Sequence, residues 1–147
     1  MRISTRAKYG IRLLFELAKN YGKGIVMLRD IAKRQAISEK YLSKIVLQLK
    51  GAGIINSIRG AKGGYVLANS PDNINLKNVV EVLEGKPLIM DCINDMFNCK
   101  LKLGCPAFEL WMGLLEVINV YLGSKTLKDL VLNYENKLKS YQEIYYI

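Results

Sequence analysis

The sequence predicts a mainly α-helical fold with one small β-hairpin. Apolar residues recur every three or four positions along most of the chain, which is typical of amphipathic helices. One Gly-rich stretch, residues 60–64, separates two short runs rich in β-branched and aromatic residues. The 147 residues are 50% apolar and 24% charged. This composition is that of a globular domain with a core, and it excludes a disordered or fibrous chain.

Three helices are expected before the hairpin. Ser4 or Thr5 provides an N-cap for the first helix, and Ser38 provides one for the third, after a turn at residues 35–37. The apolar residues of the third helix form one stripe. In order, the expected elements are a helix at 4–20, a strand-like piece at 25–28, a helix at 29–34 and a helix at 39–50.

The hairpin completes a recognisable order of elements. We expect its strands at residues 54–59 and 65–68, joined by the Gly-rich loop. Helix, short helix, turn, helix and hairpin within seventy residues predict a winged helix-turn-helix. A turn cluster at 69–73 then marks the expected boundary between a region at 1–70 and a region at 71–147, itself one compact unit.

The second region contains one unusually apolar helix. Residues 107–122 hold only three strongly polar side chains, Glu109, Glu116 and Asn119, so this helix has no polar face. Either it forms the core of a monomer or a second subunit covers it, and the short chain favours a homodimer with a long C-terminal dimerisation helix. The other expected helices lie at 75–84 and 126–139.

Charge is distributed very unevenly along the chain. Residues 1–70 hold 14 Lys and Arg against 3 Asp and Glu, whereas residues 71–147 hold 8 against 10. Such a basic half predicts a polyanionic partner, in particular nucleic acid, although a solvated basic face is the simpler alternative. Histidine is absent, which excludes Ser-His-Asp and Cys-His catalysis and argues against an enzyme. With no secretory signal and no run of about 20 apolar residues, a cytoplasmic protein without a membrane segment is expected.

The basic half supplies candidate contacts to double-stranded DNA. On the third helix, Lys40 and Lys44 suit phosphates, Tyr41 suits a sugar or a phosphate, and Ser43 suits a base edge or a phosphate. No Arg or Gln among them offers a bidentate base contact. The hairpin loop adds Arg59, a candidate for the minor groove, together with Gly60, Lys62, Gly63 and Gly64, although an ordinary basic hairpin is the alternative. Further phosphate contacts are expected from Arg2, Arg6, Lys8 and Arg12.

Three cysteines lie in a segment without helical periodicity. Six residues separate Cys92 from Cys99, and five separate Cys99 from Cys105. An odd number of thiols in a cytosolic chain argues against a disulfide framework. Three soft ligands point to a thiophilic metal or an iron–sulfur cluster, whereas a structural zinc site would need a fourth ligand. Three free cysteines packed as small apolar residues remain the alternative.

These motifs together resemble the bacterial Rrf2 family of transcription regulators, in particular its IscR-, NsrR- and RirA-like branches. The resemblance extends over MRISTRAKYGIRLL, ISEKYLSKIVLQLKGAGII, SIRGAKGGYVLA, NLKNVVEVLEG and the three-cysteine loop followed by LW. It implies a homodimeric winged-helix repressor or activator that binds a pseudo-palindromic operator. It further implies that Cys92, Cys99 and Cys105 hold a 2Fe–2S or 4Fe–4S cluster, that Arg59 enters the minor groove, and that the major groove is faced by Ser38, Lys40, Tyr41, Ser43 and Lys44.

The sequence departs from the family at the fourth cluster ligand. Some members place a histidine three residues after the last cysteine, where this chain has Phe108. Others supply an aspartate from the first helix of the partner subunit, where this chain has Lys8. The open candidates are Asp91, Asp95, Glu109, a partner side chain or a small exogenous ligand. We expect a regulator that senses iron–sulfur status, redox state or nitric oxide. The alternative is a cluster-free repressor controlled by thiol oxidation or by a protein partner, as in CymR-like members that lack the triad.

Overall fold

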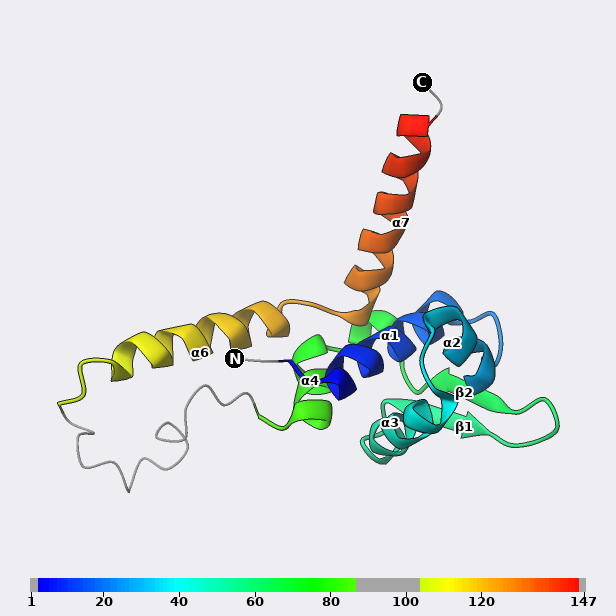
Figure 1. Cartoon of the computed structure of the whole chain (residues 1–147), viewed down its shortest axis with the longest axis horizontal. Helices are drawn as coiled ribbons and strands as arrows, with labels where there is room; N and C mark the ends of the chain where they lie inside the picture. Colours follow the sequence, from blue (N-terminus) through cyan, green and yellow to red (C-terminus); the bar gives the residue numbers. More distant parts are fainter. Residues whose placement is uncertain (1–2, 87–103, 146–147) are drawn as a thin grey trace.

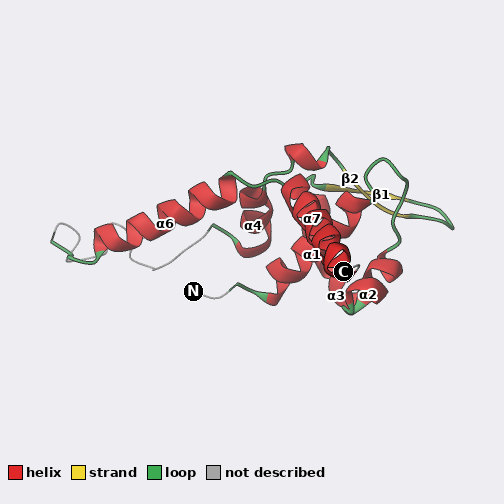
Figure 2. Ribbon diagram, turned by 90° about the horizontal axis from the view of Figure 1, so that it is seen from above, coloured by secondary structure: helices red, strands yellow, loops and turns green. Residues whose placement is uncertain are grey.

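The computed structural model describes residues 3–86 and 104–145 of the chain (Figure 1). The described residues form a bundle of helices and one two-stranded antiparallel sheet, which projects from one side of the bundle (Figure 2). In chain order the elements are α1 (Thr5–Lys19), α2 (Leu28–Gln35), α3 (Glu39–Gly51), β1 (Ile55–Ile58), β2 (Gly64–Leu67), the 3-10 turn η1 (Pro71–Asn73), α4 (Leu76–Glu84), α6 (Phe108–Gly123) and α7 (Leu127–Tyr145).

Helix α1 lies at the centre of the core and packs against α2, α3, α4 and α7. Its N-cap is Ser4, one of the two predicted candidates, whose hydroxyl oxygen accepts the N–H of Ala7 at 3.2 Å. A side chain at Gly10 would collide with the buried Leu83, so glycine lets α1 approach α4 closely. Because α4 and α7 contribute Leu83 and Leu127 to the same core, the packing continues across the turn at 69–73. The division there into two functional regions stays a prediction.

The expected helix-turn-helix is formed by α2 and α3. Ala36 ends α2 in the left-handed conformation, with a φ of 51°, and the N–H of Ile37 donates to the carbonyl of Ala32 at 3.0 Å. The buried Ile37 then anchors the turn. Ser38 is the N-cap residue of α3 as predicted, although its side chain makes no capping hydrogen bond. The hydroxyl of Ser38 is therefore not used to cap the helix.

The hairpin pairs Ile55 with Leu67 at its base and Ile58 with Gly64 near its tip. Of the predicted strand at 25–28, only Val26 pairs, exchanging two hydrogen bonds with Tyr65 at 2.9 and 3.1 Å. A Cβ on Gly64 would collide with the carbonyl oxygen of Val26. A Cβ on Gly63 would lie 2.5 Å from the carbonyl oxygen of Ile58. The paired glycines are thus required by the protein's own backbone.

Helix α7 begins with a reciprocal cap. The backbone N–H of Thr126 donates to the carboxylate of Asp129 at 2.8 Å, and the N–H of Asp129 donates to the Thr126 hydroxyl oxygen at 3.3 Å. The first of these bonds holds the pKa of Asp129 below its ordinary value, because it favours the ionised form. The helix then extends to Tyr145, six residues beyond the predicted end.

Helix α6 extends away from the rest of the molecule (Figure 1). It packs against α4, yet none of its residues is buried, and Leu110, Val117 and Val120 are 60–65% exposed. Among residues 3–86 and 104–145, nothing buries this helix as the core of a monomer, and its apolar surface is left uncovered by them. No helix within the described residues combines the length and the apolar character that crossing a membrane requires.

Candidate nucleic-acid interface

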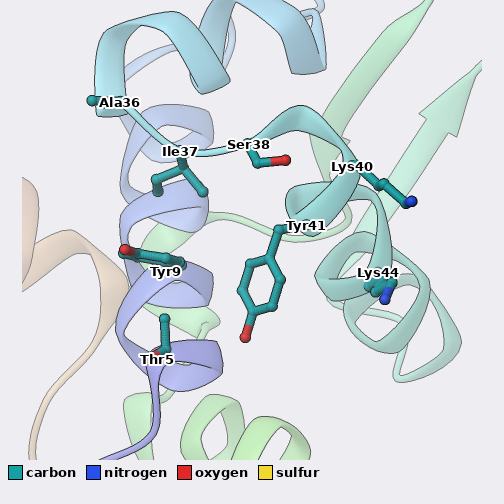
Figure 3. A pocket seen from close by; sticks show the side chains of 8 residues that line it. All are labelled: Thr5, Tyr9, Ala36, Ile37, Ser38, Lys40, Tyr41 and Lys44. Carbon is teal, nitrogen blue, oxygen red and sulfur yellow. The ribbon is translucent and has the colours of Figure 1, made fainter.

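Helix α3 presents one face to the core and the other to solvent. Its buried residues are Leu42, Ile45, Val46 and Leu49. Lys40, Ser43 and Lys44 are exposed on the other side. In Figure 3 the side chains of Lys40 and Lys44 lie on the side of Tyr41 that faces away from α1. Two cations and a hydroxyl on the exposed face of α3, the second helix of the helix-turn-helix, are suited to the major groove of DNA.

The hydroxyl of Ser43 is constrained by the backbone of its own helix. It donates to the carbonyl oxygen of Glu39 at 2.9 Å. Because a hydroxyl has a single hydrogen, its oxygen is left as an acceptor. In the major groove, base-edge donors are the amino groups of adenine and cytosine, whereas guanine presents acceptors. In this conformation Ser43 is therefore suited to adenine or cytosine.

A shallow groove lies between the start of α1 and the start of α3 (Figure 3). Tyr41 is half-buried there, and its ring meets that of Tyr9 edge-on, with 5.8 Å between the centroids. The Tyr41 ring is therefore held against α1 and offers mainly its hydroxyl to a ligand. Thr5 also lines the groove. Thr5, considered only as an N-cap, and Tyr9 were not predicted to line a groove, because nothing in the sequence shows which face of α1 meets α3.

The basic residues of α1 fall into two groups. Arg6 and Lys8 are exposed. Arg12 instead donates to the side-chain oxygen of Gln35 at 2.7 Å and to its carbonyl oxygen at 2.5 Å, at the end of α2. Because these bonds use the guanidinium within the chain, Arg12 positions α2 and is poorly placed for the predicted phosphate contact. Arg2 lies outside the described residues.

One buried carboxylate strengthens the link between α1 and α2. Glu16 is 4% exposed. It accepts hydrogen bonds from Arg34 at 2.9 Å and from the side-chain amide of Gln35 at 2.5 Å. Both donors are on the last turn of α2, directly before the turn that leads into α3. These hydrogen bonds therefore hold the end of α2, and with it the turn into α3, against α1.

The hairpin loop places Arg59, Gly60 and Lys62 on the surface. A cleft beside it is lined by Arg59, by Glu39 at the start of α3, and by Arg29 at the start of α2. Arg29 was not among the contact residues predicted from the sequence. A signal existed, because a cation in the first turn of a helix faces the positive end of the helix dipole and is unfavourable there unless it has another role.

The proposed cysteine ligands fall only partly within the described chain. Cys105 is partly buried, three residues before α6, and its carbonyl oxygen accepts the N–H of Phe108 at 3.3 Å. Cys92 and Cys99, like Asp91 and Asp95, lie outside the described residues. Among residues 3–86 and 104–145, no group of three or more Cys, Asp or Glu side chains comes together as a metal site.

The known proteins to which this chain is similar are transcriptional regulators. The family model Rrf2, an iron-dependent transcriptional regulator, matches residues 3–133. The transcriptional regulator CymR of Bacillus subtilis is 37% identical over 141 residues, which cover 96% of this chain and 97% of that protein. The regulator IscR of Xenorhabdus nematophila is 31% identical, over 92% of this chain and 82% of that protein.

Solved structures of transcriptional regulators have a fold similar to that of this chain. The structure of CymR, the global cysteine regulator of B. subtilis, matches with a TM-score of 0.78 and 38% identity, covering 90% of this chain and 98% of that one. The structure of T. potens IscR matches with a TM-score of 0.74 and 33% identity, covering 93% and 90%. These relatives are transcriptional regulators rather than enzymes, and they confirm the predicted winged-helix fold.

Proposed function

Because the chain belongs to the Rrf2 family of transcriptional regulators, we propose that it is a homodimeric, sequence-specific DNA-binding regulator whose affinity for its operator is controlled by an iron–sulfur cluster. The observation that carries the proposal is the shared exposure of Lys40, Ser43 and Lys44 on α3 and of Arg59 and Lys62 on the hairpin. These are the two elements with which a winged helix-turn-helix holds a duplex.

In the proposed complex, α3 lies in the major groove and the hairpin lies along the neighbouring minor groove. Lys40 and Lys44 neutralise phosphates, while Ser43 accepts a hydrogen bond from a base. Arg59 enters the minor groove from the loop. Additional contacts come from Ser38, Tyr41, Arg2, Arg6, Gly60, Lys62, Gly63 and Gly64. The phosphate contacts hold the protein in register, and the base contacts provide sequence preference.

We propose that α6 is the dimerisation helix. Leu110, Val117 and Val120 give it an apolar surface that the single chain leaves 60–65% exposed. A second copy of the same helix would remove that surface from water at both subunits. Two winged helices related by a twofold axis would then face a pseudo-palindromic operator, with half-sites about one DNA turn apart.

The donor set of the chain fits three of the four ligands that a cluster needs. Cys92, Cys99 and Cys105 would hold it as thiolates, and the fourth ligand would be a carboxylate, a partner side chain or an exogenous group. When bound, the cluster supplies chemistry that responds to iron, oxygen or nitric oxide. Cys105 is joined to the first turn of α6 by the hydrogen bond from Phe108. Its position therefore affects α6, and α6 packs against α4 and through it against α1.

A cluster-free regulator is the second candidate. Its support is the likeness to two CymR structures: that of B. subtilis, named as the global cysteine regulator, and that of Staphylococcus aureus CymR in an oxidised form. In this version the thiols, Cys105 among them, are oxidised reversibly or a protein partner binds. Lys100 and Lys102 in the same segment would favour the thiolate.

Anaerobic purification followed by iron and sulfide analysis separates the two. We expect coloured, iron-containing wild-type protein, loss of iron in Cys92→Ala, and retention of iron in the neighbouring control Asn98→Ala. Iron-free protein whose DNA affinity is unaltered in Cys92→Ala would contradict control by a cluster. A reversible disulfide or sulfenate detected by mass spectrometry, without metal, would support the second candidate.

A further inference from the structure

Helix α3 carries one apolar side chain that its packing does not explain. Leu47 is 71% exposed, the highest value among the large apolar side chains of the described residues. At about 100° per residue, Leu47 lies with Lys40 and Lys44 on the line directly opposite the buried stripe of α3. No other large apolar side chain of this helix is exposed. Leu47 is therefore the apolar element of the same surface that presents Ser43 and the two lysines.

The chemistry of the major groove offers a specific counterpart for such a side chain. Base edges there present hydrogen-bond donors and acceptors, and a single apolar group, the 5-methyl of thymine. Leu47 lies four positions after Ser43, which is about 6 Å along the helix and about two base-pair steps of B-DNA. Leu47 therefore lies near a base close to the one beside Ser43. Because its side chain has no hydrogen-bonding group, it can make only an apolar contact with that base.

We propose that Leu47 is a specificity-determining residue that contacts the 5-methyl group of a thymine in each half-site. The proposal rests on the proposed DNA-binding function and adds the base that α3 reads. It adds an apolar base contact to the hydrogen-bonding contact that Ser43 makes from the same surface. Ser43 accepts from an amino group, and Leu47 selects a methyl group.

The test starts from duplexes selected from a randomised library by the full-length protein. Each thymidine of a selected half-site is replaced in turn by deoxyuridine, which removes only the methyl group. We expect one position at which the wild type binds about fourfold more weakly, since burying one methyl group is worth about 0.8 kcal/mol. Leu47→Ala should lose this difference at that position, Leu47→Met should retain most of it, and the control Lys137→Ala, on the exposed outer part of α7, should leave it unchanged.

Each outcome has a distinct meaning. A deoxyuridine effect that disappears in Leu47→Ala supports the assignment. Duplex binding with no sensitivity to deoxyuridine at any position overturns it and leaves the proposed function intact. A deoxyuridine effect of equal size in Leu47→Ala assigns the methyl contact to another residue and also overturns it. Failure to select any duplex would instead contradict the proposed function itself. Thermal unfolding of Leu47→Ala monitors folding, which should be unaffected because the side chain is exposed.

Discussion

Replacing the exposed lysines of α3 should change the salt dependence of DNA binding by a predictable amount. The logarithm of the affinity falls with the logarithm of salt concentration, with a slope of about 0.9 for each phosphate that a protein cation neutralises. Lys40 and Lys44 are exposed and lie on the side of Tyr41 that faces away from α1 (Figure 3). In a dimer each substitution removes two such cations. Lys40→Gln and Lys44→Gln should therefore each reduce the slope by about 1.8.

Fluorescence anisotropy with a labelled duplex, titrated at several salt concentrations, measures this slope. Lys137→Gln on the exposed outer part of α7 is the matched control, and it should leave the slope unchanged. Arg12→Gln is a second control. It should weaken binding with little change in slope, because the guanidinium is bonded to Gln35. If Lys40→Gln and Lys44→Gln bind with the wild-type slope, the assignment of this face to phosphates is wrong.

Three other substitutions test the fold and the assembly. Glu16→Ala should lower the free energy of unfolding by about 2 kcal/mol, because Arg34 and Gln35 lose their shared acceptor; an unchanged urea midpoint would refute this. Gly64→Ala should cost about 2 kcal/mol through collision with the carbonyl of Val26, and a loss below about 0.5 kcal/mol would contradict it. Val117→Lys should give a folded monomer in analytical ultracentrifugation, and a stable dimer would place the interface elsewhere.

The helical part of the fold follows from periodicity because the core positions of α1, α3 and α4 recur every three or four residues. The strand predicted at 25–28 did not form as such, since Gly24 has a φ of 124° and α2 already begins at Leu28. Only Val26 is left to pair with the hairpin. The end of α7 was also missed, because its last turns pack against nothing in the described chain that would impose a pattern.

In the candidate site too, features set by helical periodicity could be predicted, whereas contacts between distant segments could not. The apolar stripe was sufficient to predict which face of α3 is buried and which presents its lysines to solvent. That the exposed face binds DNA stays a prediction. The role of Arg12 could not be predicted, because its partner Gln35 is twenty-three residues away and their contact depends on how α2 packs. Leu47 was not singled out, because a leucine in a helix is normally a core residue and only the structure shows that it is exposed.

The central claim is that the basic first half binds duplex DNA and that the cysteine segment sets how tightly it does so. The most direct test titrates one selected duplex, at fixed ionic strength without oxygen, with the iron-loaded protein and with the same protein after chelation. We expect the two Kd values to differ at least about fivefold, which corresponds to a coupling free energy of about 1–3 kcal/mol. Equal Kd values would contradict control by the cysteines, and no binding of either form at low ionic strength would contradict the account as a whole.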